Sequence, residues 1–459
     1  MAGPTRVAGV WGQLSRALAL LLPAVLLASC GQATVAPTPT PTPASCQALA
    51  RHRPLGAGRR QPSTPPAALV VRLKPGVPLQ QAEELASAAG AEVVKVRRRS
   101  RALLARPRPG VGTTGVSNRL ASDVRVARVE PDVRVRALEV TPNDPLFREQ
   151  WALWQIRAPA AWEVTRGLGV KVAVLDTGIA QHPDVAGAAE GYDFVADDPD
   201  PTDPGDPNFD CTSHGTMVAS IVAAQTNNGR GIAGVTWGAS GAQILVARVL
   251  DEQGNGSLLD VEEALRWAAD RGARVANLSL GTETAAPCPE GLRAAVQEVV
   301  ARGVLVVAAA GNNGPRSGTV VCPANLDAVV AVGATGPEGT VAYYSSRGPE
   351  VDLTAPGGAA SGVCSADVRT ASPSASDPED YPCAAGTSFA APHVSGAAAL
   401  VLARWPSLDP SEVRAKLERG AEDVGLPGRD PDSGCGMLRA DRAVRGETAS
   451  APACAPVSR

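Results

Sequence analysis

The chain has 459 residues and a formal net charge of −3 at pH 7. So small a net charge selects neither nucleic acid nor an acidic membrane surface as an electrostatic partner. It contains nine cysteines but no C-x-x-C pair, and its four histidines are scattered, which does not favour a zinc site.

The N-terminus has the pattern of a secretory signal. Two arginines precede an apolar run over residues 17–28 that is too short for a comfortable membrane span. The run ends in L-A-S-C at residues 27–30, which resembles the bacterial lipobox, where the signal is removed before a lipidated cysteine. We therefore predict a signal peptide over residues 1–29 and lipidation of Cys30. An ordinary signal peptide followed by an incidental cysteine is the alternative.

Residues 30–66 are predicted to be the lipid-anchor cysteine and a linker. The run A-P-T-P-T-P-T-P over residues 36–43 favours an extended polyproline-II spacer and cannot build a core. Such a spacer suits a protein held at the cell surface or outer membrane by its lipid alone.

A small α+β unit is predicted over residues 67–140. Its apolar periodicity gives these elements: strand 68–73, helix 79–89, strand 91–96 and strand 124–135. The arginine-rich run R-R-R-S-R at residues 97–101 has no interleaved aromatic residue. It therefore predicts a solvated loop or a protease-sensitive site, and not a nucleic-acid-binding segment.

A larger unit is predicted over residues 141–446, followed by a tail over residues 447–459. Apolar strands alternate with helical patterns: strands 170–175, 244–249, 274–280, 304–309 and 329–333, and helices 215–224, 258–271, 291–302 and 389–403. Near-continuous apolar strands separated by helices predict a parallel sheet that is covered on both faces.

Three motifs stand at the ends of these elements: D-T-G at residues 176–178, H-G-T at 214–216 and G-T-S-F-A at 386–390. Each of them alone would be an ordinary turn or helix cap. Together they supply a carboxylate, an imidazole and a hydroxyl in the order Asp, His, Ser. A serine becomes a good nucleophile when an imidazole takes its proton and a carboxylate orients that imidazole.

In this order and setting the motifs resemble those of the subtilisin-like serine proteases (subtilases, peptidase S8 family), over about residues 143–446. The resemblance implies an α/β, doubly wound, mostly parallel sheet with helices on both faces. It also implies a serine endopeptidase that cleaves polypeptides through an acyl-enzyme. In that role Asp176 would orient His214, and His214 would take the proton of Ser388. No cofactor is required for this chemistry, and a monomer is expected.

The resemblance also implies a substrate cleft. In the family, the asparagine of an A-A-G-N segment donates its side-chain amide to the oxyanion, which here corresponds to Asn312; taken alone, Asn312 would be a turn residue. The backbone N–H of Ser388 would be the second donor. The residues expected to line the bound substrate are Ser279, Leu280, Gly281, Ala310 and Gly311.

Immediately upstream of such a domain, the unit over residues 67–140 resembles the family's pro-domain (inhibitor I9-like), which assists folding and blocks the cleft until autoproteolysis. A small structural domain that stays attached is the alternative. Cleavage near residue 140 would separate the catalytic domain from the lipid and release it to the extracellular space.

The sequence favours two other functions less. A lipid-anchored binding protein on an inactive protease scaffold would be favoured by a missing member of the Asp-His-Ser set, and none is missing. A lipase or esterase is disfavoured because Ser388 lies in G-T-S-F-A, without the G-x-S-x-G elbow.

Eight cysteines remain besides Cys30, an even number that suggests disulfides in an exported protein. Eight cysteines allow 105 connectivities. The best two pairings are Cys288 with Cys322, and Cys364 with Cys383. Cys46, Cys211, Cys435 and Cys454 stay unassigned.

Six aspartates lie among prolines over residues 197–210. This pattern fits either a solvated acidic loop or an oxygen-rich structural Ca²⁺ site, although its spacing matches no EF-hand. Metal ligands are therefore left unassigned.

Overall fold

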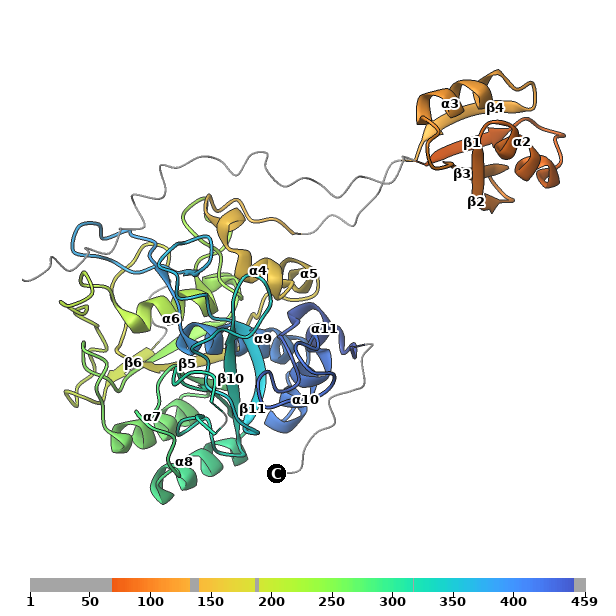
Figure 1. The fold of residues 1–459 in the computed structure, drawn as a ribbon. Coiled ribbons are helices and arrows are strands. Elements are labelled where there is room, and N and C mark those ends of the chain that lie inside the picture. The colour runs from red at the N-terminus through yellow and green to blue at the C-terminus, as the bar shows by residue number, and fades with distance from the viewer. Residues whose placement is uncertain (1–67, 133–139, 186–189, 317, 450–459) are drawn as a thin grey trace, which may run out of the picture. The chain divides into compact units, whose positions relative to one another are not determined.

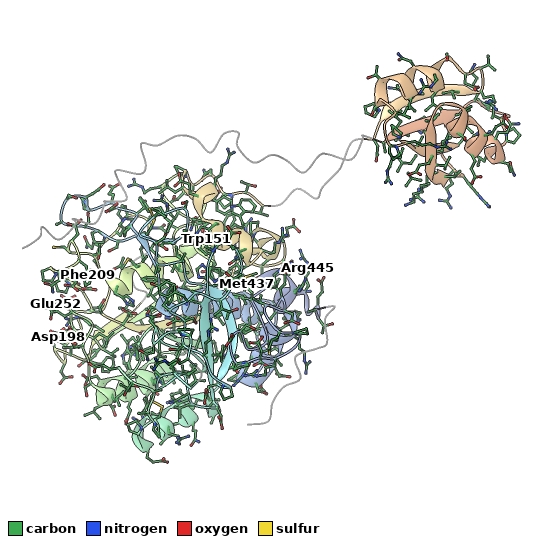
Figure 2. All side chains as sticks on the ribbon, viewed as in Figure 1. Trp151, Asp198, Phe209, Glu252, Met437 and Arg445 are labelled. Carbon is green, nitrogen blue, oxygen red and sulfur yellow. A yellow bond between two sulfur atoms is a disulfide. The ribbon has the colours of Figure 1, made fainter. Side chains whose placement is uncertain are left out.

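The computed structural model describes residues 68–132, 140–185, 190–316 and 318–449. They form a small α+β body over residues 68–132 and a larger α/β body over residues 140–449 (Figure 1). The predicted signal peptide, Cys30 and the Pro/Thr-rich linker lie outside the described residues.

The small body has the order β-α-β-β-α-β. Its elements are β1 (Leu69–Leu73), α2 (Ala82–Ala88), β2 (Ala91–Arg97), β3 (Ala102–Pro107), α3 (Thr113–Ser122) and β4 (Val126–Pro131), with a short 3-10 turn η1 (Leu79–Gln81) before α2. The sheet is antiparallel with strand order β2-β3-β1-β4. Sequence periodicity predicted β1, α2, β2 and β4 but missed β3 and α3. Of the predicted loop at residues 97–101, residue 97 ends β2 and residues 98–101 form the turn between β2 and β3.

The larger body is built on a seven-stranded, wholly parallel sheet with strand order β11-β10-β9-β8-β5-β7-β6. Its strands are β5 (Lys171–Asp176), β6 (Glu190–Asp193), β7 (Gln243–Arg248), β8 (Val275–Leu278), β9 (Leu305–Ala309), β10 (Val329–Thr335) and β11 (Val351–Pro356). A separate antiparallel pair joins β12 (Val368–Arg369) to β13 (Cys383–Ala384). The predicted α/β fold class is confirmed, although β6 and β11 were not predicted.

Helices cover both faces of this sheet (Figure 1). They are α4 (Trp151–Gln155), α5 (Ala158–Trp162), α6 (His214–Ala223), α7 (Leu258–Asp270), α8 (Glu290–Ala301), α9 (Thr387–Arg404), α10 (Pro410–Gly420) and α11 (Ala440–Arg445). Alternate residues of β5 enter two different cores. Val172 and Val174 pack with α6 and α9 on one face, whereas Ala173 and Leu175 pack with α7 and α8 on the other. Burial on both faces explains why the strand sequence is almost uninterruptedly apolar.

The chain reverses its direction of winding at β5. From β5 it builds β6 and β7 on one side, and it then returns to build β8 to β11 on the other. In open parallel sheets, ligands bind outside the carboxyl ends of the strands at such a switch point. Asp176 is the last residue of β5, and the segments that contain Ser279 and Asn312 follow β8 and β9 at the same edge.

Disulfides join Cys288 to Cys322 and Cys364 to Cys383, which are the two pairings that the sequence predicts. Cys435 is also disulfide-bonded, whereas Cys211 is a free thiol. Cys46 and Cys454 lie outside the described residues. Within the described ranges, no helix has the length and apolar character that crossing a membrane requires.

Candidate active site

The structure brings the Asp176 carboxylate and the His214 imidazole together. Asp176 is almost fully buried, and its Oδ1 accepts hydrogen bonds from His214 Nδ1 (2.7 Å) and from the backbone N–H of Thr177 (2.8 Å). Because a carboxylate oxygen can only accept, the proton of the neutral ring is on Nδ1. His214 Nε2 is therefore left free to accept a proton from a nucleophile.

His214 is the first residue of α6, which begins one residue before the helix predicted over residues 215–224. Ser213 caps this helix, since its side chain accepts a hydrogen bond from the N–H of Thr216 (3.1 Å). The His214 side chain is 32% exposed, so one edge of the ring faces solvent. Desolvation lowers the pKa of His214, but attraction by Asp176, the hydrogen bond to it and the charge of Asp203 together raise that pKa above its ordinary value.

Ser388 is the second residue of α9, and the ring of its neighbour Phe389 packs against the His214 ring with centroids 5.5 Å apart. The Ser388 hydroxyl donates a hydrogen bond to the backbone oxygen of Ser279 (3.1 Å). Within the described part of the chain, no hydrogen bond joins Ser388 to His214. Catalytic contacts of this kind are often loose before substrate binds and tighten in the complex.

A buried chain of polar groups fixes the start of α9. Pro392 has no N–H to donate to the carbonyl oxygen of Ser388 four residues earlier, so that oxygen lacks its helical partner. It accepts a hydrogen bond from Ser279 Oγ instead (2.7 Å). Ser279 Oγ in turn accepts from Asn277 Nδ2 (3.0 Å), and Asn277 Oδ1 accepts from Ser395 Oγ (2.8 Å). The strand β8 and the helix α9 are thereby tied together beside Ser388.

Asn312 follows β9 and is held by Thr387. Its Oδ1 accepts hydrogen bonds from the backbone N–H of Thr387 (2.9 Å) and from Thr387 Oγ1 (3.0 Å). A backbone N–H can only donate, which assigns the accepting atom of the Asn312 amide to oxygen. Nδ2 therefore points the other way, and it lies 3.4 Å from where a Cβ on Gly386 would be. Gly386 lies two residues before Ser388, so this donor lies near the start of α9.

The residues expected to bind substrate flank the same edge. Ser279 and Leu280 follow β8 directly, and Gly281 is exposed. Ala310 is buried, and its N–H and C=O pair with Val332 and Val321, so it supports the wall of the site from behind.

The Val321 side chain lies between the segments that follow β8 and β9. A Cβ placed on Gly281 would lie 2.4 Å from Val321 Cγ2, and one placed on Gly311 would lie 3.0 Å from Val321 Cγ1. The Val321 side chain itself is buried. Glycine at both positions is therefore what lets this valine sit between them.

The acidic stretch over residues 197–210 does not gather its carboxylates. Asp198, Asp200 and Asp206 each accept a backbone N–H two residues ahead, at 2.8, 3.1 and 2.8 Å. Such local bonds are typical of turns. Within the described ranges no cluster of three or more His, Cys, Asp or Glu side chains is arranged to hold a metal ion.

Comparison with known proteins identifies the class. The model of the subtilase family (peptidase S8) matches residues 167–437, more than half of the chain, and the chain therefore belongs to this family. The halolysin-like extracellular serine protease Nep of Natrialba magadii is 38% identical over 69% of this chain and 54% of its own length. Subtilisin Savinase of Lederbergia lenta is 39% identical over 64% of this chain and 98% of its own length.

A solved structure of a protease from Pseudoalteromonas arctica PAMC 21717 has 34% sequence identity and a TM-score of 0.61, and the match covers 67% of this chain and 99% of that one. The chain spans about half the length of Nep and of some other curated relatives.

Sequence reasoning missed several residues that shape the site: Asn277, Ser395, Thr387, Val321 and Asp203. Thr387 lies inside the G-T-S-F-A motif, but nothing in the pattern shows that its hydroxyl orients Asn312. The buried polar residues Asn277 and Ser395 stand within apolar runs, which is the one signal that could have found them.

Proposed function

We propose that the chain is an exported serine endopeptidase that cleaves polypeptides. The observation that carries the proposal is the 2.7 Å hydrogen bond between His214 Nδ1 and Asp176 Oδ1, at the sheet edge where Ser279, the hydrogen-bond partner of Ser388, follows β8. Several relatives are themselves named as serine or extracellular proteases.

In the proposed reaction, His214 Nε2 takes the proton of the Ser388 hydroxyl as Ser388 Oγ attacks the scissile carbonyl carbon. The carbonyl oxygen becomes an oxyanion, which the Ser388 N–H and Asn312 Nδ2 stabilise. The imidazolium then gives its proton to the leaving amine, and an acyl-enzyme remains. Water, deprotonated by His214, hydrolyses this ester and regenerates Ser388. The Asp176 carboxylate stays ionised throughout and stabilises the imidazolium.

Val321 supports a preference for small side chains immediately before the scissile bond. In this proposal the substrate backbone adds as a strand beside Ser279, Leu280 and Gly281. The side chain before the cut would then point between Gly281 and Gly311, into the space that Val321 occupies.

We include in the proposal that residues 67–140 act as a pro-domain, which is removed by the chain's own activity. One observation supports an assisting role for this body: Val94 and Val96 remain exposed on β2, although a small domain normally buries such residues. The lipid anchor at Cys30 completes the proposal, with cleavage near residue 140 releasing the catalytic domain.

We also propose that a structural Ca²⁺ ion binds at two carboxylates outside the acidic stretch. Asp144 and Asp184 are both buried, and Asn228 contacts both, through its N–H to Asp144 and its Nδ2 to Asp184. Burial raises the pKa of Asp184 to about 6 despite hydrogen bonds from Ile232 and Asn228, and the charge of Asp144 adds to the rise. Two buried, like-charged oxygen ligands are what a hard cation would offset.

One comparison tests the central proposal. The full chain and its Ser388→Ala variant are expressed, assayed on a peptide substrate and sequenced from the N-terminus. The parent should hydrolyse the peptide and appear as a form that begins between about residues 138 and 144, while Ser388→Ala should be inactive and keep residues 67–138. Equal activity of the two would refute the proposed nucleophile. Equal processing would show that another protease performs the cut or that the segment is no pro-domain.

Membrane fractionation tests the anchor. The uncut Ser388→Ala chain should stay with the membrane, and adding Cys30→Ala should release it. Release of both chains would refute lipidation at Cys30.

A further inference from the structure

A second carboxylate, Asp203, lies buried next to the catalytic pair without being part of it. It stands in the segment between β6 and α6 and is 3% exposed. Its backbone N–H donates to the oxygen of Ile179 (3.2 Å), which holds it beside the turn that follows Asp176. Burial sets Asp203 apart from the other acidic residues of this segment, such as Asp206 and Asp210, which are half-buried or exposed. The earlier Asp193 is also buried.

Three donors converge on the Asp203 carboxylate. Oδ1 accepts the N–H of Gly205 (2.8 Å), and Oδ2 accepts the hydroxyls of Ser213 (2.6 Å) and Thr177. Each hydroxyl is itself an acceptor, because Thr177 Oγ1 receives the N–H of Gly215 (2.9 Å) and Ser213 Oγ receives that of Thr216 (3.1 Å). The two N–H groups leave each hydroxyl its own proton to donate to Asp203, so the network fits the ionised carboxylate.

The two hydroxyls belong to the immediate neighbours of the catalytic residues. Thr177 directly follows Asp176, and Ser213 directly precedes His214. One carboxylate thus holds the turn that presents the aspartate and the cap of the helix that presents the histidine. A carboxylate that only fixed the loop between residues 203 and 213 would need only one of these hydrogen bonds.

The negative charge of Asp203 costs the resting fold free energy. Burial raises the pKa of Asp203, three hydrogen bonds oppose the rise, and the like charge of Asp176 adds to it. The nearby guanidinium of Arg248 donates a hydrogen bond to the backbone oxygen of Thr177 (3.1 Å). Its ion pairs, however, are with Asp193 (2.6 Å) and Glu252 (3.4 Å) and not with Asp203. A favourable partner for Asp203 arises when His214 becomes an imidazolium, since the charge of Asp203 helps to raise the pKa of His214.

We propose that Asp203 is a positioning residue that stabilises the protonated His214 of the transition state, through its charge and through its bonds to Thr177 and Ser213. Such an interaction exists in full only after proton transfer, so it lowers the barrier and not merely the energy of the bound substrate. This inference rests on the proposed role of His214 as the catalytic base.

Asp203→Asn tests the inference, because it removes the charge and keeps the size of the side chain. Asp200→Asn is the matched control. Asp200 lies in the same segment, is exposed and accepts the N–H of Thr202, and its replacement changes the net charge equally. Two measurements are made: the pH profile of kcat/KM on a peptide substrate, and an NMR titration of His214 in full-length Ser388→Ala chains, where only four histidines contribute signals.

In Asp203→Asn, the midpoint of the His214 titration should move to lower pH in both measurements. The plateau of kcat/KM should fall about tenfold, mainly through kcat. Asp200→Asn should match the parent in both.

A loss of activity or stability with an unmoved His214 titration would overturn the inference and leave Asp203 a loop clamp. Equal shifts in the two variants would also overturn it, as would failure of the Asp203→Asn chain to fold. The NMR titration needs no turnover, so a parent chain without peptidase activity would refute the proposed function while the effect of Asp203 on His214 is still measured.

Discussion

The side chain of Ser279 donates a hydrogen bond to the backbone oxygen of Ser388 (2.7 Å), and the side chain of Ser388 donates one to the backbone oxygen of Ser279 (3.1 Å). The two residues are 109 positions apart in the sequence. This reciprocal pair joins the segment proposed to bind the substrate backbone to the proposed nucleophile, and it occupies the carbonyl that Pro392 leaves without a helical donor.

Removing the Ser279 hydroxyl should therefore destabilise the fold. Ser279→Ala leaves the Ser388 oxygen and Asn277 Nδ2 without their partner, which should lower the free energy of unfolding by about 1–3 kcal/mol. The measurement is denaturant unfolding in the Ser388→Ala background, which prevents self-digestion. Ser407→Ala is the control, because Ser407 is exposed, and it should change the free energy of unfolding by less than about 0.5 kcal/mol. Equal effects of the two variants would contradict the role of the buried network.

Asn312→Ala should separate oxyanion stabilisation from substrate binding. The Asn312 amide would meet a charge that exists only in the transition state, so kcat should fall by about 10²–10³ with little change in KM. Steady-state kinetics on a peptide substrate measure both constants. The adjacent exposed residue supplies the control, Asn313→Ala, which should behave like the parent. A change confined to KM would remove Asn312 from the oxyanion role.

Activity should rise with pH as His214 loses its proton, because the imidazolium cannot act as a base. The pKa of His214 is raised above its ordinary value of 6.5, so the midpoint of the rise should lie above that value. Asp176→Asn removes the attraction that holds the ring in its protonated form, and it should move the midpoint to lower pH and lower kcat by about 10⁴. A rate that stays flat from about pH 5 to pH 9 would count against a histidine base.

Val321→Gly should widen the range of side chains that the enzyme accepts immediately before the scissile bond. With the valine removed, kcat/KM for a peptide with Phe before the cut should rise by about 10- to 100-fold, because space between Gly281 and Gly311 becomes free. The matched substrate with Ala at that position should change by no more than about threefold. A parent enzyme that already prefers Phe would show that the side chain binds elsewhere.

Calcium should raise the melting temperature of the parent, with the largest effect above about pH 6. The pKa of Asp184 is about 6 in the folded chain against an ordinary 3.8. Without a cation, the fold therefore loses stability as pH rises from 3.8 through 6, because the buried carboxyl group has to ionise. A bound Ca²⁺ would offset the charge. Asp184→Asn should lose most of the calcium effect, while Asp200→Asn keeps it. The same gain in all three proteins would place the ion elsewhere.

Much of the fold follows from local sequence patterns, as β5 shows. Its residues are buried on both faces, so the apolar run before Asp176 identifies both a strand and the sheet edge where the aspartate emerges. The helix α3 was missed because few of its residues are apolar, and it buries only Val116 and Leu120. Weak periodicity of this kind gives no signal until the tertiary partner is known.

The residues of the candidate site also divide into those that local sequence patterns reveal and those that they do not. Residues proposed to act through a motif, such as His214 and Ser388, are visible in the sequence because the order of the motifs is specific. Asp203 and Val321 are not, since what matters is which side chain lies next to them in space. The acidic stretch made Asp203 look like one of several equivalent carboxylates, and only its burial separates it from its exposed neighbours.

The order of these segments along the chain bears on when the candidate site becomes complete. Ser388 lies near the start of a helix that comes late in the chain, and its neighbours Ser279 and Asn312 follow two strands in the middle of the sheet. The Asp176–His214 pair, 38 residues apart, forms between far earlier segments. If His214 and Ser388 act as proposed, a chain that has not yet brought α9 against β8 would have a base but no aligned nucleophile. In the proposed mechanism, such a chain would not yet cleave peptide bonds.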